Sequence, residues 1–586
     1  MKKLMAKLKE ILSKEDSKCY FIIIMLALMV CSLLFIGYPQ GQDTIYHISR
    51  TVGTEIALKE GQILPLIASN FVNDFGYSWN LFYPPLPNYI MMIIKLVSHS
   101  YVKALNILIF LTVALSGIFM FSFMKKVTKS SKIALLASIL YMLAPYRLVD
   151  IYIRGALGEV MAFMFLPLVF NGLYNILEDN GKRHYLLSIG AIGLLLSHNI
   201  STLLVIMSCA VYIIINIKKV FKKEVIKYLL INAGFILAIV MFFYGPMLQN
   251  KMYTDYAVFN ELKGSSAGLH DHSVYVYQLL FGKMQYEWSY SLNDPNSQNL
   301  DMCFAVGLTL IIPILFTPFI YKKIDKNKRK IYVTTLAIGL LFLILTTTII
   351  PWDKLPNFIA FIQYTYRFLL ISTFFLSIVA AVNLDKLSEK LDMKTIMIYT
   401  MIALMYITPL LQAAPIIKGL DWKEFYSTEK MEEEQRFSSY CATYEYLPSK
   451  AFNNKNYIAK RSQEPIIKSG NCEISQSQKD KLDITFEVKN VSEETKIELP
   501  FIYYLGYRAD IDGEELQTTE SENGFVEITI PEGKEGKAEI KYCGTKLYYT
   551  SLAVSIIGFI IFLIYIIMYE RKIYSIKIRK ENICQK

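Results

Sequence analysis

The chain has 586 residues, of which 54% are hydrophobic and 19% are charged. Soluble domains carry about a quarter charged residues, so this composition, together with its long apolar runs, excludes an ordinary soluble protein. Counts of 28 Gly, 19 Pro and 41 Tyr exclude a collagen-like or disordered chain. The net charge of +11 does not indicate nucleic acid as a partner, because the basic residues flank the apolar runs.

Twelve apolar runs predict helices that cross a membrane, since about 20 apolar residues span the hydrocarbon core. Those at 133–145 and 185–197 are short. A further run, PPLPNYIMMIIKLV at 84–97, is interpreted as an amphipathic helix on the outer surface, because its crossing would move every later loop to the other side. The predicted spans are 19–37, 104–124, 133–145, 160–177, 185–197, 200–217, 228–245, 302–321, 331–350, 368–384, 395–414 and 547–569.

The loops between these spans indicate the orientation of the chain. With the N-terminus inside, the cytoplasmic segments hold 32 of the 61 Lys and Arg residues. Cytoplasmic loops are enriched in these residues, so both termini are expected on the cytoplasmic side of the cell membrane.

Three long segments are then expected outside. The last of them has 18 basic and 25 acidic residues, and from Glu473 onward its short alternating runs are typical of antiparallel strands in a β-sandwich. The expected fold is an α-helical polytopic membrane protein with an extracytoplasmic β-sandwich before the last helix. Its predicted parts are a transmembrane domain at 1–414 with outer loops 38–103 and 246–301, an outer domain at 415–546 with a helical linker and then the sandwich, and a last transmembrane helix with a basic tail at 547–586.

The first outer loop contains three polar residues at helical spacing. Asp43, His47 and Arg50 are four and three residues apart, so a helix would place them on one face just outside the first span. A carboxylate beside an imidazole and a guanidinium can act as a general base. A solvated polar stripe at the membrane boundary is the alternative interpretation.

Arg154 and Glu159 lie at the start of the fourth span, in APYRLVDIYIRGALGEVMAF. Charged groups at the mouth of a helical bundle usually face its interior or a wet cavity, so both are candidates for a site. An internal ion pair between them is the structural alternative.

Two more outer turns carry polar groups. His198 and Asn199 lie between the fifth and sixth spans, and Gln363 and Arg367 are four residues apart before the tenth. Arg at this interface can bind a lipid phosphate bidentately. A capped turn and a snorkelling Arg explain the same residues without function. All four clusters occur on one side of the membrane, as a cavity open to the outside and to lipid requires.

The motifs occur in a recognisable order. They are D-x-x-x-H-x-x-R at 43–50, FGYSWNLFYPPLPNYI at 75–90, APYRLVDIYIRGALGE at 144–159, SHNIS at 197–201, QYTYRFL at 363–369 and YEYLP at 444–448. This order resembles the bacterial pyruvoyl-tetrahydropterin-synthase-related membrane proteins, which resemble the GT-C glycosyltransferase superfamily. The C-terminal part, with LPFIYYLGYRADIDG at 499–513 and one last span, is similar to YfhO-type membrane proteins of that superfamily.

The resemblance implies a transferase that moves a sugar from a polyprenyl-phosphate donor to a glycan or envelope-polymer acceptor at the outer face of the membrane. In GT-C enzymes an acidic residue of the first outer loop acts as base or metal ligand. By position this residue is Asp43. The usual second acidic residue is not adjacent to it, so use of a divalent cation such as Mg²⁺ or Mn²⁺ stays open and no metal ligand is assigned. The predicted roles are catalysis by Asp43, His47 and Glu159, donor-phosphate binding by Arg50, Arg154 and Arg367, and substrate binding by Tyr83, His198, Asn199 and Gln363.

Two other classes of function stay open. A transporter or flippase for a lipid-linked saccharide would predict charged residues in mid-bilayer and internal pseudo-symmetry, and neither is visible in the sequence. A non-catalytic scaffold of an envelope-polysaccharide pathway would tolerate the loss of Asp43.

Overall fold

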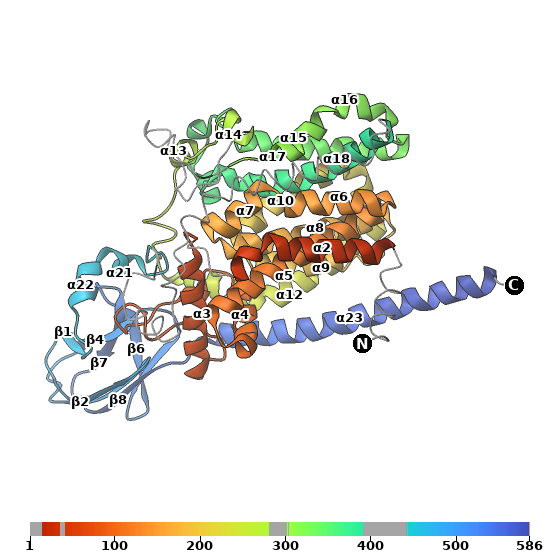
Figure 1. Cartoon of the computed structure of the whole chain (residues 1–586). Coiled ribbons are helices and arrows are strands. Elements are labelled where there is room, and N and C mark those ends of the chain that lie inside the picture. Colours follow the sequence, from red (N-terminus) through yellow and green to blue (C-terminus); the bar gives the residue numbers. More distant parts are fainter. Residues whose placement is uncertain are drawn as a thin grey trace.

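The computed structural model describes residues 15–35, 41–280, 302, 304–390, 441 and 443–584. Most of them are helical, and an antiparallel β domain precedes the last helix (Figure 1). The predicted span at 395–414 and most of the predicted linker after it lie outside the described residues.

The axes of the bundle helices are roughly aligned with one another. Helix α3 (Thr44–Lys59) crosses them at the end near the β domain (Figure 1). The predicted surface helix is confirmed as a separate element, α4 (Leu86–Ser98), whose Ile93, Leu96 and Val97 are exposed. The bundle contains α2 (Glu15–Val30), α5 (Tyr101–Thr128), α6 (Ser131–Met142), α7 (Pro145–Val149), α8 (Leu157–Glu178), α9 (Leu186–Leu195), α10 (Asn199–Ile215), α12 (Lys223–Tyr253), α15 (Leu308–Leu315), α17 (Lys326–Leu345), α18 (Leu369–Lys390) and α23 (Lys546–Cys584).

In the described part of the chain, five helices are long and apolar enough to cross a membrane, namely α5, α8, α12, α18 with the turn before it, and α23. A sixth is formed if α6 and the segment Pro145–Arg154, which are bent by 44°, count as one span. The remaining predicted spans that fall within the described residues form helices that are shorter or carry more charge. The number of twelve spans therefore stays a prediction.

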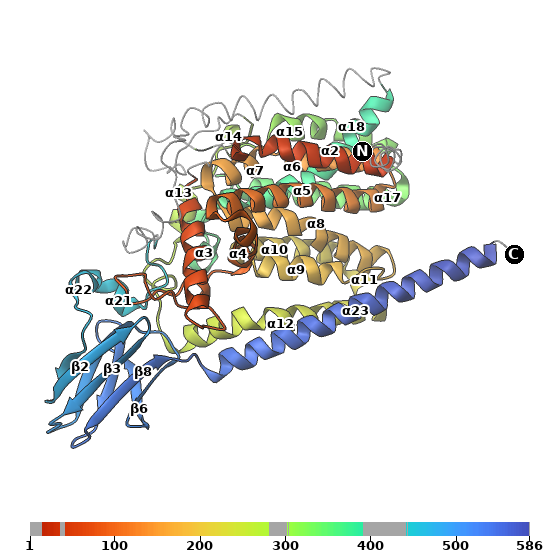
Figure 2. The ribbon, with the colours of Figure 1, turned by 60° about the horizontal axis from the view of Figure 1, so that its bottom comes forward.

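The spans differ in how deeply they are buried. In α8 and α18, 89% of the apolar stretch is buried, whereas in α12 and α23 the share is 22%. Helices α12 and α23 pack side by side at the edge of the bundle (Figure 2). Their exposed apolar side chains are those that a lipid environment accommodates.

One helix continues past the predicted end of its span. The span at 228–245 was expected to end at Gly245, with an outer loop beginning at Pro246, but α12 continues through Pro246 to Tyr253. Proline removes one hydrogen bond from a helix without ending it when its neighbours satisfy the freed carbonyl. The helix therefore extends eight residues, just over two turns, past the predicted end of this span.

The end of the bundle away from α3 gathers the basic loops. Ion pairs join Lys125 to Asp16, and Lys126 to Asp179 at 2.8 Å. Further pairs at this end join Lys132 to Asp385, Arg183 to Glu570 and Lys219 to Glu178. The loops that the sequence assigned to the cytoplasm therefore lie together at one end.

The β domain is one sheet of eight antiparallel strands in the order β1-β4-β7-β6-β5-β8-β3-β2. This corrects the expectation of two separate sheets, because the β5–β6 hairpin connects the halves through pairs such as Ala509 with Leu516. Buried Phe486 and Ile528, from opposite halves, belong to one hydrophobic core, so the sheet curves around it. The strands are β1 (Ile466–Ser469), β2 (Glu473–Asp480), β3 (Asp483–Lys489), β4 (Thr495–Ile502), β5 (Tyr507–Ile511), β6 (Glu514–Glu520), β7 (Phe525–Ile530) and β8 (Gly536–Tyr542).

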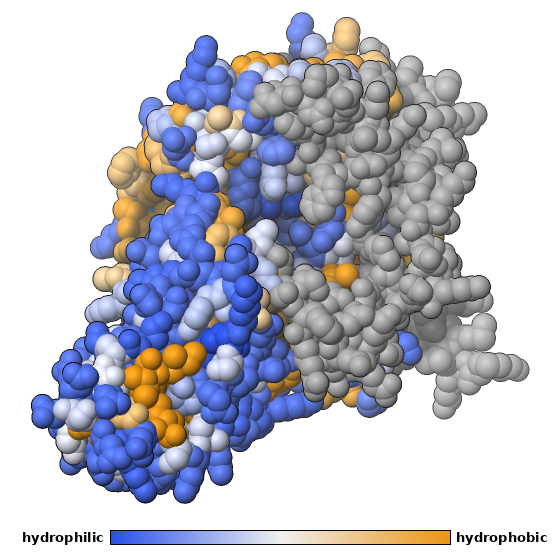
Figure 3. Space-filling model, turned by 90° about the vertical axis from the view of Figure 1, so that its left-hand side faces the viewer, coloured by the Kyte–Doolittle hydropathy of each residue, from blue (hydrophilic) through white to orange (hydrophobic). Residues whose placement is uncertain are grey.

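Segment 64–82 shares this core. The ring centroids of Phe75 and Phe525 are 5.1 Å apart, and the backbone N–H of Ile502 donates to Phe75 O at 2.9 Å. Burial of each large apolar side chain contributes roughly 1.5–3 kcal/mol. Segment 64–82 therefore fixes the β domain against the end of the bundle. Figure 3 shows this side of the molecule, on which the lower part is mainly hydrophilic with one hydrophobic patch.

Candidate functional site

Asp43 caps the N-terminal end of α3 and is tied through its backbone to the turn before α8. Its N–H donates to Arg154 O at 2.7 Å, and the N–H of Gln42 donates to Ile153 O at 3.0 Å. The Asp43 side chain is exposed, and no hydrogen bond or ion pair to it occurs within the described residues. The carboxylate is thus both accessible and fixed in position by its backbone.

Two glycines allow this approach. A Cβ on Gly41 would lie 2.6 Å from the Cα of Gly155, and Gly155 has a positive φ of +61°. Side chains at either position would separate the two segments, since L-residues rarely adopt this φ and real Cβ atoms do not approach so closely. The close contact of the two loops therefore depends on glycine.

A buried ionic cluster lies next to Asp43, on the π-helical turn η3 (Asp150–Arg154) and the first turn of α8. Arg154 Nη1 donates to Asp150 Oδ1 and, at 2.8 Å, to Glu159 Oε2. Tyr146 OH donates to Glu159 Oε1 at 2.5 Å. Asp150 and Glu159 are fully buried, so each relies on Arg154 to compensate its charge. The expected alternative of an internal Arg154–Glu159 pair is confirmed.

Arg367 reaches the same cluster from a distant part of the sequence, the turn η8 (Thr365–Phe368). Its Nη1 donates to Gln363 Oε1 at 2.6 Å, and its Nε is 3.7 Å from Glu159 Oε2. Arg367 is buried, whereas Gln363 is exposed and has a positive φ of 64°. Glu159 thus lies between two arginines.

Arg50 is the third buried guanidinium. Its Cζ is 3.8 Å from the ring centroid of Tyr83, and its Nη2 donates to Pro84 O at 3.1 Å. Among the described residues, its Nε and Nη1 have no hydrogen-bond partner and no carboxylate pairs with it. A buried cation with unused donors is suited to bind an anion.

His47 is buried between these groups. Burial lowers its pKa well below 6.5, and the nearby Arg50 and His198 lower it further, so the imidazole is neutral near pH 7. In the part of the chain that the structure describes, its Nδ1 has no partner and no side-chain hydrogen bond joins it to Asp43. The predicted helix is confirmed from Thr44 onward, with His47 and Arg50 buried on it, but Asp43 precedes it as the N-cap residue and His47 does not pair with the carboxylate.

The turn between α9 and α10 closes the site on another side. The His198 Nδ1 accepts a hydrogen bond from Ser201 N–H at 3.3 Å and caps α10. Asn199 donates to Phe82 O at 3.1 Å and accepts from Tyr244 OH at 2.9 Å. A capped turn was the structural alternative for this segment, with Ser197 and Asn199 as the expected caps, but the capping side chain is that of His198. These contacts hold the loop before α4 against α10.

Tyr83 connects that loop with the ionic cluster. A Cβ on Gly158 would lie 2.9 Å from Tyr83 OH and 3.1 Å from His198 Cδ2. The Tyr83 ring is 5.8 Å from His47 and is half-buried. The structure therefore brings all ten predicted site residues to one end of the bundle, beside the β domain.

The sequence reasoning missed three residues. Asp150 and Tyr146 lie in the same motif as Arg154, and the i, i+4 spacing of Asp150 and Arg154 was a usable signal. Glu445, in YEYLP, accepts a hydrogen bond from Tyr46 OH at 3.0 Å. Nothing in the local sequence indicates that Glu445 approaches α3, because the contact spans about 400 residues.

The surroundings of Asp43 shift its acidity. Protein packed around the residue removes water and raises its pKa above 3.8; Arg154 and Arg367 oppose this effect, while Glu445 and Glu159 add to it. A carboxylate with a raised pKa is a stronger base than an ordinary one.

The carboxylates do not form a full metal site. Within the described residues, no three His, Cys, Asp or Glu side chains are placed to hold a metal ion. Asp43 and Glu445 could supply at most part of a ligand set. No chemical step is therefore assigned to a cation.

Comparison with known proteins places this site in a family. Residues 81–416 match the family described as "6-pyruvoyl-tetrahydropterin synthase related domain; membrane protein", which is more than half of the chain. The chain belongs to this family of membrane proteins. The match includes Tyr83, Arg154, Glu159, His198 and Arg367, and it confirms the family resemblance and the membrane location. An uncharacterized protein of Lactococcus lactis subsp. cremoris (strain MG1363) is 26% identical over 605 residues, covering 94% of this chain and 95% of that protein. This similarity extends through the β domain.

Proposed function

We propose that this family member is a GT-C-type glycosyltransferase that moves a sugar from a polyprenyl-phosphate donor to a cell-envelope acceptor at the outer face of the membrane. The proposal includes twelve spans, with the β domain outside and both termini inside. The gathering of the basic loops at the far end of the bundle supports this orientation.

The observation that carries the proposal is the position of Asp43. Its accessible carboxylate lies beside the buried guanidinium groups of Arg154 and Arg367, both of which act on its pKa. Transfer from a lipid phosphate needs this pair of features, because a base must remove a proton while cations receive the charge of the leaving group.

The reaction would proceed as a single displacement. Asp43 takes the proton of the acceptor hydroxyl, and the hydroxyl oxygen attacks the anomeric carbon of the donor sugar. The bond between that carbon and the phosphate oxygen breaks, and its electron pair stays on the phosphate. The lipid phosphate gains one negative charge as it leaves, so positive groups act more strongly in the transition state than before it.

The three arginines would contribute differently. Arg154 already binds two carboxylates, whereas Arg50 has two unused donors and Arg367 is only 3.7 Å from its carboxylate. Arg50 and Arg367 are therefore the proposed ligands of the donor phosphate. Glu159 is fully buried and would position Arg154 and Arg367 rather than exchange protons.

The accessible side chains around the three arginines would hold the sugars. Tyr83 presents a half-buried ring at the site, and Gln363 is exposed next to Arg367. Rings and amides of this kind stack on and hydrogen-bond to saccharides. His198 and Asn199 would support the wall through the capping contacts described above.

The test is transfer of radiolabelled sugar from an undecaprenyl-phosphate donor pool in membranes, comparing the parent chain with Asp43→Asn at equal expression. Loss of a general base lowers the rate by about 10²–10⁴-fold, and this loss is expected for Asp43→Asn. Asp353→Asn, which changes an exposed carboxylate outside the site, is the matched control.

Two results would contradict the proposal. Unchanged incorporation in Asp43→Asn would favour the scaffold hypothesis. If Asp43→Asn instead lowers the amount of donor lipid that reaches the outer face, as measured by a flipping assay in the same membranes, a transporter would be favoured.

A further inference from the structure

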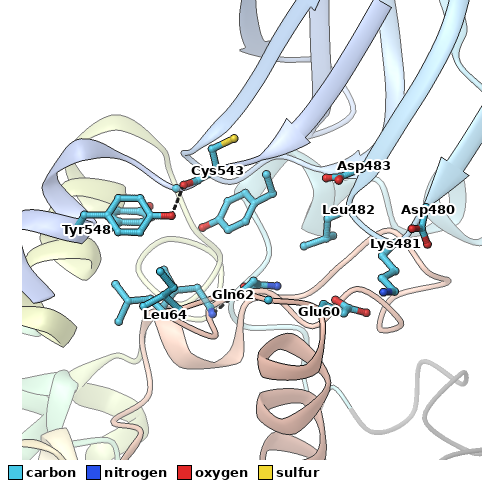
Figure 4. Close-up of a pocket in the computed structure, with 15 residues that line it drawn as sticks. Glu60, Gln62, Leu64, Asp480, Lys481, Leu482, Asp483, Cys543 and Tyr548 are labelled. Carbon is cyan, nitrogen blue, oxygen red and sulfur yellow. Dashed lines mark hydrogen bonds between the residues drawn. The ribbon is translucent and has the colours of Figure 1, made fainter.

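A cavity of about 230 Å³ lies where the end of α3, the β2–β3 hairpin and the start of α23 meet (Figure 4). None of its lining residues belongs to the site around Asp43. Its volume is below the roughly 300–1,000 Å³ of pockets for drug-sized molecules, so it suits a smaller ligand.

One wall of this cavity is acidic. Glu60, Asp480 and Asp483 line it together with Lys481. Glu60 Oε1 accepts a hydrogen bond from Ser69 Oγ at 2.6 Å, whereas its Oε2 is buried without a partner among the described residues.

The carboxylates of this wall are poorly compensated. Burial raises the pKa of Glu60 and of Asp483, and Asp480 adds to both effects. Lys481 opposes the rise at Glu60, but it forms no ion pair within the described part of the chain. Three carboxylates and one ammonium leave a formal charge of −2 on the cavity.

The other wall is aromatic and is formed by Tyr542, Tyr548 and Tyr549. Tyr549 OH donates to Cys543 O at 2.7 Å and Tyr548 OH donates to Leu505 O at 3.2 Å, so these two hydroxyls are used and their rings are left to line the cavity. In Figure 4 Tyr548 lies on the side opposite Glu60 and Asp480. Tyrosine rings attract cations through their π faces.

We propose that this cavity binds a small organic cation, an ammonium group carried by a molecule about the size of a monosaccharide. The acidic wall would pair with the ammonium, and the rings would cover the rest of the ligand. A metal ion is a poorer match, because in the described chain no three acidic, His or Cys side chains converge on one point. The proposal does not depend on the transferase activity.

Titration calorimetry of the full chain in detergent micelles tests this, with glucosamine as the probe at a pH where its amine is protonated. N-acetylglucosamine, which has the same ring without the charge, is the control ligand. Glucosamine is expected to bind saturably and N-acetylglucosamine at least about tenfold more weakly, since a lost charge contact is worth about one factor of ten.

Two variants with opposite effects separate charge from folding. Glu60→Gln keeps the acceptor for Ser69 and is expected to weaken glucosamine binding about tenfold. Lys481→Gln removes the one cation among the described lining residues and is expected to strengthen binding. Thermal melts verify that both variants are folded. Equal binding of the two sugars, no saturable binding of glucosamine, or changes of the same sign in both variants would overturn the proposal.

Discussion

Gly155 lies so close to Thr44 that a Cβ on Gly155 would be 1.9 Å from the Thr44 hydroxyl oxygen. The contact joins the turn before α8 to the first residue of α3, directly beside Asp43. The distance between Asp43 and Arg154 is therefore set by a residue that has no side chain.

Gly155→Ala is expected to move the start of α3 and to lower both stability and transfer activity. The added methyl group must displace Thr44, and the left-handed backbone is strained for alanine, which together cost about 1–3 kcal/mol. Thermal unfolding of the purified chain and the transfer assay measure the two effects.

Gly513→Ala is the matched control. Gly513 has a φ of +83°, and a Cβ there meets no atom within 4 Å, so only the backbone strain applies. Equal losses of stability in the two variants would show that the contact with Thr44 does not matter.

Glu159→Gln is expected to destabilise the bundle strongly. The neutral amide would leave Arg154 and Arg367 buried with less compensating charge, and breaking a buried ion pair from one side typically costs about 3–5 kcal/mol. Denaturant or thermal unfolding in detergent would record the loss.

Glu570→Gln provides the comparison at the other end of the bundle. Glu570 pairs with Arg183 at 2.9 Å, but both side chains are partly exposed, so its loss should cost about 0–1 kcal/mol. A loss for Glu159→Gln no larger than this one would contradict the account of the buried cluster.

The sequence predicted α3, α4, the antiparallel strands of the β domain and the end of the bundle at which the predicted site residues meet. Helical spacing located α3, and the positions of Arg154, His198 and Arg367 at the same predicted side of the membrane correctly anticipated that they meet. Charge and turn residues are local signals, so they are readable without a structure.

The partners within the site were not predictable in this way. Arg154 could pair with Glu159, Asp150 or a ligand, and only the π-helical turn at 150–154 brings both carboxylates to it. Glu445 and segment 64–82 reach their partners through long-range contacts, for which a single sequence carries no periodic signal. The continuation of α12 through Pro246 was not predictable, because local helix propensity disfavours proline inside a helix.

Transfer activity is expected to fall as the pH is lowered through the pKa of Asp43. Only the deprotonated carboxylate can take a proton, and its pKa is raised above 3.8, so the acid limb should lie above that of an ordinary Asp. The pH–rate profile of membranes measures this. The residual activity of Asp43→Asn should lack this limb, and its persistence in the variant would assign the limb to another group.

Folding of the β domain should also depend on pH, through Glu498 on β4. This carboxylate accepts hydrogen bonds from Tyr457 and Ser521 at 2.7 Å, from Asn523 at 3.0 Å and from Arg461 at 3.1 Å. Burial alone would raise its pKa, but these bonds outweigh burial and hold it below 4.5.

A lowered pKa means that the folded state favours the charged form. The stabilisation is complete above the unfolded pKa of about 4.5 and is lost as the pH falls through the lower folded value. Circular dichroism melts of the full chain at decreasing pH should show it. Glu498→Gln should be less stable near neutral pH and less sensitive to acid.

Glu539, on β8 of the same sheet, tests whether buried contacts or surface charge pairs of a carboxylate govern the acid response of the domain. Lys537 and Lys541 lower its pKa to about 2, yet all three side chains are partly exposed, so salt and water screen these pairs. Glu539→Gln should therefore leave the acid dependence almost unchanged. If it flattened the dependence as much as Glu498→Gln, surface charge rather than the buried contacts of Glu498 would govern the acid response of the domain.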